Sequence, residues 1–324
     1  MMTSLAGGKG GRGINPLDVG GQYIYTTFYK ESKLFDQYGI VRIDVEGSMS
    51  PHFLCHKKKI RAVCVNPFDM DVVASGSDDR SVIVSRFSIG DPRKEKSIPV
   101  SAQPWSLTWY AHDVLLVGKN DGTVESINWR SDAERPQYFS QVNEQVPVWF
   151  CYYVDKEQTL ITITGRGCSA YRSGHKYELL NDNIRSYAFN KATNKVALAV
   201  ADGDGVSYTL YQLDFTMRKI RFVNAQPVNL PPLSKRLMHG ALFQNLNGTE
   251  TIAVYDETLK RVIIHSIPDK ECGGKPDQSI VPLRADMGTD INQVLATPLL
   301  DDNKLTHRIT LVSATSFVQF LILC

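Results

Sequence analysis

Five residues in the first third of the chain have side chains that could together perform hydrolysis. Ser75, Ser77, Asp78 and Asp79 crowd one short stretch, and His56 lies a short way upstream. In a hydrolytic triad, a histidine takes the proton of a serine and a carboxylate orients that histidine. Such a site also needs an exposed serine beside oxyanion donors, and the chain has no G-x-S-x-G motif. The alternative is that these side chains hydrogen-bond to one another inside the fold.

The segment that carries most of these residues, Ile60–Phe87, has the pattern of three β-strands joined by two turns. The pattern returns 124 residues later, where Ile184–Asn190 matches Ile60–Asn66. The next strand keeps the same spacing, because Lys195–Leu198 matches Asp71–Ala74. An internal repeat of this kind predicts a supersecondary unit that occurs several times.

Five further stretches extend the repeat along the chain. Two of them begin at Pro104 and Val148, so three steps span the 124 residues and the period is about 41 residues, within the ~40–45 of propeller blades. The fainter units are Gln22–Val45, Gly240–Ile267 and Ile291–Leu323. Each consists of short alternating or apolar runs between Asp, Gly, Asn and Ser, which is typical of strands and turns.

These repeats predict an all-β fold. A four-stranded blade is too small to bury both of its faces alone, whereas blades stacked radially cover one another and leave only short outer edges. We therefore expect a single β-propeller of about seven four-stranded blades over residues 21–324. Residues 1–20 are expected to form a flexible glycine-rich tail.

Motifs in the second and third units have counterparts in a known family. Cys55–His56 precedes the first strand of the second unit, and Asp79 lies in the tight turn before its third strand. Asp121–Thr123 forms the corresponding turn of the third unit. These features resemble the WD-repeat family, which has Gly-His and an Asp at these points. The Trp-Asp pair that names the family is replaced by Ser85–Arg86 and Ile127–Asn128.

In WD-repeat blades, the histidine and the turn aspartate belong to a hydrogen-bond network that pins the turns. The resemblance therefore implies a structural role, not a catalytic one, for His56, Ser75, Asp79 and Asp121. Such a network satisfies polar groups that the strands bury. Residues 39–79 are also similar to coronin, over about two units of the repeat.

The overall composition is that of an ordinary soluble protein. Of 324 residues, 43% are hydrophobic and 22% charged, and the formal net charge is +2. This charge argues against a surface built throughout for phosphate backbones. The longest apolar run, Phe317–Cys324, is far shorter than the ~18 residues of a membrane span, so we expect no membrane insertion.

The cysteines and the N-terminus predict the compartment. The N-terminus has no apolar segment typical of a secretory signal. No two cysteines form a C-x-x-C pair, so reduced, buried thiols are expected, in the cytoplasm or nucleus. The six cysteines are Cys55, Cys64, Cys151, Cys168, Cys272 and Cys324.

Three further patterns resemble ligand-binding motifs but lack the necessary context. Gly8–Gly13 fits G-x-G-x-x-G, yet it follows no strand and opens no βαβ unit. Asp202–Gly205 and Asp301–Asn303 resemble fragments of calcium loops without the later ligands, and they are typical of hairpin turns. We therefore expect no cofactor and no metal.

The candidate binding residues surround the starts of the inner strands, which ring the channel mouth in a propeller. The basic run His56–Arg61 could contact an anionic partner, or could be a solvated loop. Trp105, Trp149 and Arg185 occupy the same point in their own units. Trp and Arg are favoured anchors at interfaces, although both tryptophans could equally be core residues. The residues predicted to bind a partner are Lys57, Lys58, Lys59, Arg61, Trp105, Trp149 and Arg185.

These observations predict a non-enzymatic scaffold, a WD-repeat propeller subunit that holds other proteins in a complex. One alternative is a coronin-like, actin-associated propeller. Another is a propeller that binds RNA or DNA through the basic loop 56–61. A propeller enzyme would need converging acids, histidines or metal ligands, and the sequence suggests no such set.

The two ends of the repeat predict how the ring closes. The last unit offers three strands, and Ile14–Val19 is the segment that could serve as a clasp, although Pro16 makes it a poor central strand. We expect either a weak clasp through Ile14–Val19 or an incomplete terminal blade. An incomplete blade would accept a strand from a partner at its open edge.

Overall fold

The computed structural model describes the chain from Leu17 to Ile322, apart from short gaps. These gaps are residues 21–22, 31–36, 45–47, 52, 89–90, 132–136, 140–141, 203–204, 217–218, 229, 231–239, 245–248, 257–260, 269–277, 283–290, 302–303 and 314–316. The structure divides into two compact units, Met1–Asn181 and Asp182–Cys324.

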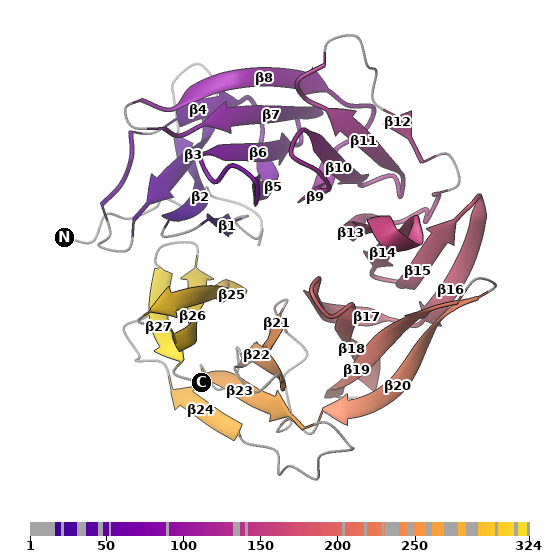
Figure 1. Ribbon diagram of the computed structural model, residues 1–324. Helices are drawn as coiled ribbons and strands as arrows, with labels where there is room; N and C mark the ends of the chain where they lie inside the picture. The colour runs from indigo at the N-terminus through magenta and orange to yellow at the C-terminus, as the bar shows by residue number, and fades with distance from the viewer. Residues whose placement is uncertain are drawn as a thin grey trace. The chain divides into compact units, whose positions relative to one another are not determined.

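In its described residues, the first unit contains four antiparallel sheets, each of four strands that follow one another in the chain (Figure 1). The first sheet is β1 (Leu17–Gly20), β2 (Tyr23–Lys30), β3 (Gln37–Ile43) and β4 (Phe53–His56). The second is β5 (Ile60–Val65), β6 (Val72–Ser77), β7 (Ser81–Arg86) and β8 (Arg93–Pro99). The third is β9 (Pro104–Trp109), β10 (Val114–Lys119), β11 (Val124–Asn128) and β12 (Gln137–Tyr138). The fourth is β13 (Val148–Val154), β14 (Thr159–Thr164), β15 (Gly167–Arg172) and β16 (His175–Asn181), with a 3₁₀ turn η1 (Asp155–Glu157) between its first two strands.

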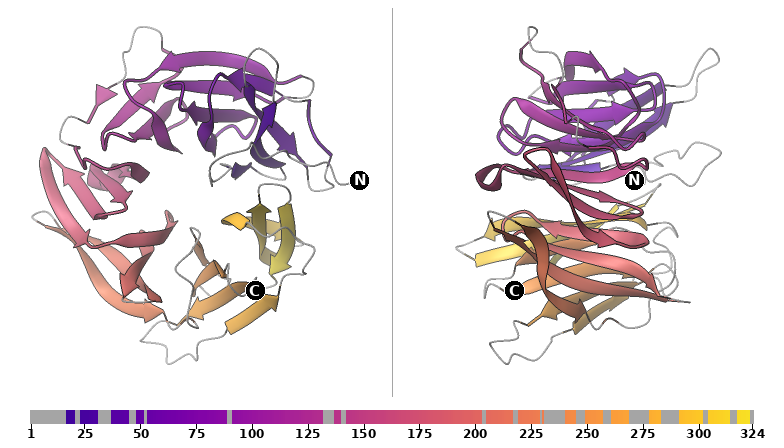
Figure 2. Two further views of the ribbon diagram at one scale, coloured as in Figure 1. Left: turned by 180° about the vertical axis from the view of Figure 1, so that it is seen from behind. Right: turned by 90° about the vertical axis from the view of Figure 1, so that its right-hand side faces the viewer.

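The second unit contains three antiparallel sheets in the described residues, and Figure 2 shows the sheets from two further sides. The fifth sheet is β17 (Ile184–Asn190), β18 (Lys195–Asp202), β19 (Gly205–Phe215) and β20 (Ile220–Val228). The sixth is β21 (Ala241–Gln244), β22 (Glu250–Asp256), β23 (Arg261–Ile267) and β24 (Gln278–Pro282). The seventh has three described strands, β25 (Ile291–Asp301), β26 (Lys304–Ser313) and β27 (Phe317–Ile322).

Burial along the strands of the second sheet explains their composition. Every residue of the central strand β6 is buried, whereas the outer strand β8, "RKEKSIP", is mostly exposed. A central strand covered on both faces must be apolar or carry small polar groups that find partners, as "VVASGS" does. The charged residues of β8 suit an edge that faces water.

The core of the first unit lies between its sheets. One cluster joins Val72, Ala74 and Val84 of the second sheet to Leu107 and Leu115 of the third. Another joins Tyr25 and Ile40 of the first sheet to residues of the second. Each sheet therefore buries its face against its neighbour, as the repeat predicts.

The second unit has a core of the same kind between its fifth and sixth sheets. Ala197 and Leu210 of the fifth sheet pack in one cluster with Leu242, Ile252 and Ile263 of the sixth. The seven predicted units thus correspond to seven sheets in the described residues, and the all-β prediction is confirmed.

The N-terminal boundary differs from its prediction. Leu17–Gly20, placed in the tail from the sequence, forms β1 and pairs with β2, where Leu17 lies opposite Thr26. The Asp18 carboxylate accepts a hydrogen bond from the Val65 N–H, 2.8 Å away, which ties β1 to the second sheet. Pro16 lies outside the described residues. The segment assigned as a clasp thus pairs within the first sheet from Leu17 onward, and Gly8–Gly13 lies outside the described residues.

Four cysteines lie in the described residues as reduced thiols: Cys55, Cys64, Cys151 and Cys168. Burial raises the pKa of Cys55 to about 12, and burial also raises the pKa of Cys168. Both thiols therefore stay protonated and weakly nucleophilic at neutral pH. Cys272 and Cys324 lie outside the described residues. In the part of the chain that is described, no helix has the length and apolar character needed to cross a membrane.

Candidate functional site

His56, Ser75 and Asp79 come together where β4 of the first sheet leads into β5 of the second. The His56 Nε2 atom lies 2.8 Å from Ser75 Oγ, and its Nδ1 atom lies 3.1 Å from Asp79 Oδ2. Ser81 adds a hydroxyl that donates to Asp79 Oδ1 at 2.6 Å. The order serine–histidine–carboxylate is the order of a hydrolytic triad.

This arrangement differs from a catalytic triad because its serine and histidine are buried. Ser75 is 0% exposed, and its hydroxyl lies 3.4 Å from the Ile83 carbonyl of the next strand. The His56 side chain is 0% exposed as well. A nucleophile must reach a substrate carbonyl beside oxyanion donors, and a serine enclosed within its own sheet has no such access. The geometry suits a junction that holds strands and turns together.

The charge of Asp79 is stabilised by its surroundings. Burial alone would raise the pKa of Asp79, but the hydrogen bonds from His56 and Ser81, the charge of His56 and the Lys57 N–H together lower it. An ionised carboxylate only accepts hydrogen bonds, so it holds these donors around itself. Asp79 therefore stays ionised throughout the neutral range.

This junction also fixes the backbone of the basic loop. The Lys57 N–H donates to Asp79 Oδ2 at 3.0 Å, and Ser77 Oγ donates to the Lys58 carbonyl at 2.9 Å. The Asp78 N–H donates to the Lys59 carbonyl at 2.9 Å. Three consecutive loop residues are thus tied to the β6–β7 turn. The network predicted to be structural and the loop predicted to bind are parts of one assembly.

The side chains of the basic loop have different environments. Lys57 and Lys58 are exposed, whereas Lys59 is half-buried. Burial lowers the pKa of Lys59, and the nearby charge of Arg61 lowers it further. Lys57 and Lys58 are therefore the lysines of this loop that face solvent.

Arg61 and Trp105, both predicted to bind a partner, lie side by side. The Arg61 guanidinium donates to both carboxylate oxygens of Asp78, with Nη2 2.6 Å from Oδ2 and Nε 2.9 Å from each oxygen. The same guanidinium lies 5.7 Å from the centre of the Trp105 ring, which is cation–π geometry. The sequence did not predict that Asp78 holds Arg61. Asp78 lies in the β6–β7 turn and Arg61 in β5, and a contact between such separate segments leaves no pattern in the sequence.

The predicted anchor residues occupy the same point of their units, as the sequence indicates, and the structure shows that this point is a β-bulge. Arg61 is skipped in the β5–β6 register, where Ile60 pairs with Ser77 and Ala62 with Gly76. The same one-residue bulge skips Trp105, Trp149 and Arg185 in their own sheets, and Asn292 in the seventh. A bulge leaves one residue unpaired in the ladder and re-aims its side chain.

The other two predicted anchors, Trp149 and Arg185, differ in exposure. Trp149 is half-buried, and its ring lies so close to Gly165 that an added Cβ would approach to 2.9 Å. Trp105 is half-buried too, so neither tryptophan is a fully enclosed core residue. Arg185 is exposed and belongs to the second unit.

Asp121 shapes its turn without a histidine. Its carboxylate accepts hydrogen bonds from the Thr123 N–H at 3.0 Å and the Thr123 hydroxyl at 2.6 Å, and Asp121 is exposed. The third sheet has a buried ion pair at another position, in which Lys119 Nζ lies 3.2 Å from Glu125 Oε2. Lys119 Nζ also donates to Ser101 Oγ at 2.6 Å. Sequence reasoning missed this pair.

A second junction, centred on Glu144, was also missed. One Glu144 oxygen accepts hydrogen bonds from the Thr162 and Tyr171 hydroxyls, each at 2.7 Å, and the other accepts from Lys176 Nζ at 2.9 Å. Burial would raise the pKa of Glu144, but the hydrogen bonds from Lys176, Tyr171 and Thr162 lower it. Glu144 lies four residues before β13, as His56 lies four residues before β5. That offset is the signal that could have found it.

The turns that resembled calcium-loop fragments are hairpins. Asp202 pairs with Gly205 between β18 and β19, and Asp301 pairs with Lys304 between β25 and β26. Within the described ranges, no cluster of three or more His, Cys, Asp or Glu side chains is placed to hold a metal ion.

Comparisons with known proteins give the fold. No family model matches the chain, and no curated protein matches its sequence. The β-propeller domain of Cps50 (Swd1) from Myceliophteria thermophila is similar in structure, with a TM-score of 0.66, 9% identity and 100% of both chains covered. Hydrazine synthase from Kuenenia stuttgartiensis has a TM-score of 0.65 and 11% identity over 95% of this chain and 96% of its own. The WD40 domain of Toxoplasma gondii coronin has a TM-score of 0.64 and 12% identity over 95% of this chain and 81% of its own.

The first of these matches covers the whole chain and a whole propeller domain. The seven sheets of the described residues agree with the blade count expected from the repeat. The chain therefore has the fold of a β-propeller, of the kind found in WD40 domains.

Proposed function

We propose that this protein is a non-enzymatic interaction scaffold, a propeller subunit that holds other proteins in a complex in the cytoplasm or nucleus. The observation that carries the proposal is the bulge shared by the inner strands. At that position stand Arg61, Trp105, Trp149 and Arg185, and Arg and Trp are the residues that most often anchor interfaces.

The Arg61–Trp105 pair is the centre of the proposed surface. Arg61 is held by Asp78 and lies over Trp105, so both side chains have restricted rotamers before a partner arrives. A preorganised contact loses less entropy on binding. Exposed Lys57 and Lys58 stand beside them on a loop whose backbone is pinned. This surface suits a protein partner that offers an apolar or acidic side chain.

The Ser75–His56–Asp79 group supports the non-enzymatic side of the proposal. Ser75 and His56 are buried, so a substrate cannot reach them, whereas their hydrogen bonds hold the basic loop in place. The likeness to hydrazine synthase concerns the fold, and fold alone does not carry an activity.

Two alternatives bind through the same face and are tested with it. A coronin-like role would give an actin partner. A nucleic-acid role would use Lys57 and Lys58, whose exposed charges could meet phosphates. Binding of RNA would weaken steeply with salt, whereas a largely apolar protein contact would not.

The test compares affinity purifications of tagged full-length protein. Arg61→Glu and Trp105→Ala should each remove the same set of partner proteins, while Arg221→Glu should retain them. Arg221 is a matched control because it is an exposed arginine that also pairs with one aspartate, Asp214. Each partner is then purified and titrated against the three variants. Partners that bind all three variants equally would refute the surface, and a salt-sensitive RNA partner would favour the nucleic-acid alternative.

A further inference from the structure

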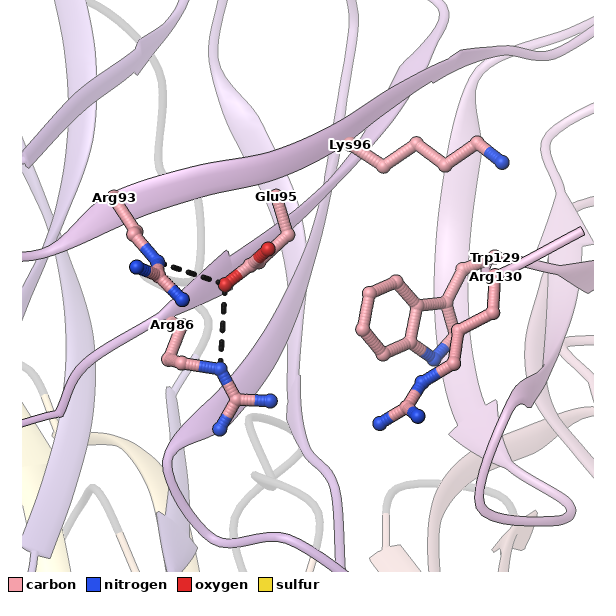
Figure 3. Close-up of a pocket in the computed structure, with 6 residues that line it drawn as sticks. All are labelled: Arg86, Arg93, Glu95, Lys96, Trp129 and Arg130. Carbon is pink, nitrogen blue, oxygen red and sulfur yellow. Dashed lines mark hydrogen bonds and ion pairs between the residues drawn. The ribbon is translucent and has the colours of Figure 1, made fainter. Parts of the chain in front are cut away.

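A groove lies on the outer side of the first unit, away from the basic loop. It has a volume of about 580 Å³ and runs between β8 of the second sheet and the residues that follow β11 of the third (Figure 3). Its lining residues are Arg86, Arg93, Glu95, Lys96, Trp129 and Arg130.

A bulge in β8 brings charged residues to this groove. Val84 pairs with Lys96 and Ser85 with Lys94, so Glu95 is the extra residue. Strict alternation would point Glu95 and Lys96 to opposite faces, and the bulge breaks that alternation. Arg93, Glu95 and Lys96 therefore line the same groove, while Lys94 does not.

Positive charge exceeds negative charge among the lining residues. Four of the six are cationic and one is anionic. The single carboxylate, Glu95, is shared, because Arg86 Nε lies 3.2 Å and Arg93 Nε 2.9 Å from the same oxygen. Arg86 also pairs with Asp69 at 3.0 Å, and Arg130 pairs with Asp113 at 2.8 Å. Arg93, whose side chain is 67% exposed and pairs with Glu95, is therefore the guanidinium with donors available for a further anion. Figure 3 shows Arg86 and Arg93 converging on Glu95, with Lys96 further along the same strand and Trp129 and Arg130 across the groove.

Trp129 supplies a second, independent indication of a ligand. It is 6% exposed, and its indole N–H is buried with no hydrogen-bond acceptor in the described part of the chain. A buried donor left without an acceptor is rare in folded proteins. The Arg130 guanidinium lies 5.0 Å from the Trp129 ring, and the Arg130 side chain is 48% exposed. Arg130 Nε lies 2.8 Å from Asp113 Oδ1, so this side chain must leave Asp113 before its rotation opens the indole N–H to the groove.

We infer that this groove binds an acidic segment of a partner protein, whose carboxylates meet the cationic side chains and accept the Trp129 N–H. The shape favours an extended peptide, because β8 is the edge strand of its sheet and can pair with a strand laid beside it. Glu95 disfavours a continuous phosphate backbone, which would pass directly over its carboxylate. The groove shares no residue with the Arg61–Trp105 surface, so this inference and the proposed function can be tested independently.

The test uses the full chain and a fluorescein-labelled peptide of alternating glutamate and serine, followed by fluorescence anisotropy. The double variant Arg93→Glu/Lys96→Glu should weaken binding by about tenfold or more, because two attractive charges become repulsive. Lys94→Glu is the matched control, as it makes the same charge change on the same strand outside the groove, and it should change binding by less than about threefold. Trp129→Phe keeps the ring and removes the N–H, so it should weaken binding by roughly threefold to tenfold.

Two further probes identify the ligand class. The same peptide with phosphorylated serines should bind at least as tightly, and a lysine–serine peptide should not bind. Failure of the wild-type protein to bind either acidic peptide would overturn the inference. Equal losses in Lys94→Glu and in the double variant would overturn it too, since they would show nonspecific attraction. Tighter binding of a single-stranded RNA oligomer that is lost in the double variant would replace the acidic peptide with a nucleic acid.

Discussion

The second and fourth sheets carry different chemistry at one position, four residues before the inner strand. Before the inner strand of the second sheet this position is His56, which meets Ser75 of β6 and Asp79 of the β6–β7 turn. In the fourth it is Glu144, which meets Thr162 of β14 and Tyr171 of β15. His56, the last residue of β4, reaches from the first sheet into the second, whereas Glu144 reaches into the fourth sheet from the segment before β13. The position is therefore a joint between loop and sheet, and more than one polar side chain can make it.

Turn length explains why the partners differ. Ser77 pairs with Ser81 across three turn residues, of which Asp79 is the second, whereas Thr164 pairs with Gly167 across two. The shorter turn has no place for a counterpart of Asp79. The fourth sheet takes the opposite charge from Lys176 of β16 instead. In the third sheet the same position is Val100, which is apolar, and Asp121 accepts hydrogen bonds within its own turn.

The largest effect is expected from removing the carboxylate of the fourth sheet. Glu144→Ala leaves the buried Thr162 and Tyr171 hydroxyls without their acceptor, and each such loss costs ~1–3 kcal/mol. We expect a loss of about 2–4 kcal/mol in the free energy of unfolding, measured by urea denaturation. Glu178→Ala, an exposed glutamate of the same sheet, is the control and should stay within about 0.5 kcal/mol. An equal loss in both variants would show that Glu144 is not a joint.

The second sheet should lose less when its carboxylate is removed. Asp79→Ala should cost about 1–3 kcal/mol, because His56 and the loop N–H lose a charged acceptor. Asp121→Ala removes the aspartate at the same turn position of the third sheet, where no histidine reaches it, and should cost clearly less. Partner binding by folded Asp79→Ala should persist. A fully stable Asp79→Ala protein without binding would overturn the structural role.

Acid should reduce the stability that Asp79 and Glu144 each contribute to the folded protein. The pKa of Asp79 and the pKa of Glu144 are lowered in the folded protein, below unfolded values of roughly 3.9 and 4.3. The stability that they contribute is complete above the unfolded values and is lost as the pH falls toward the folded ones. Urea unfolding measured from pH 6 down to pH ~3 should therefore show a decline that Asp79→Asn/Glu144→Gln makes shallower. Parallel curves for the two proteins would contradict this assignment.

The smallest effect is expected from the exposed lysines of the pinned loop. Lys57→Glu/Lys58→Glu should change the free energy of unfolding by less than about 0.5 kcal/mol, since exposed charges contribute little. Lys59→Glu should cost more, because Lys59 is half-buried beside Arg61 and Asp78. Thermal unfolding of the two variants gives the comparison. A larger loss of stability in Lys57→Glu/Lys58→Glu than in Lys59→Glu would mean that the exposed loop charges stabilise the fold.

Some of this architecture could be predicted from sequence because it depends on local patterns. Alternating apolar residues and the 124-residue offset predicted β5 and β17 and, with the shorter period, the number of sheets. His56, Ser75 and Asp79 were found as a group because a family motif spaces them. Glu144 was missed because no motif has glutamate there, although its distance from β13 is the same.

Other features depend on register or on distant parts of the chain. The bulges that skip Arg61 and Trp105 follow from how neighbouring strands align, which composition does not encode. The outer groove joins β8 to Trp129, more than thirty residues further along. Leu17–Gly20 was placed in a tail because glycines and a proline surround a strand of only four residues.

The repeated bulge has a consequence for how such a protein changes over time. A residue with no cross-strand partner is not chosen by the pairing preferences of a ladder. Replacing Arg61 or Trp105 therefore leaves the register of β5 or β9 intact, while it changes what the surface presents. On the proposed function, substitutions at these positions would change which partner binds and leave the pairing of the strands unchanged.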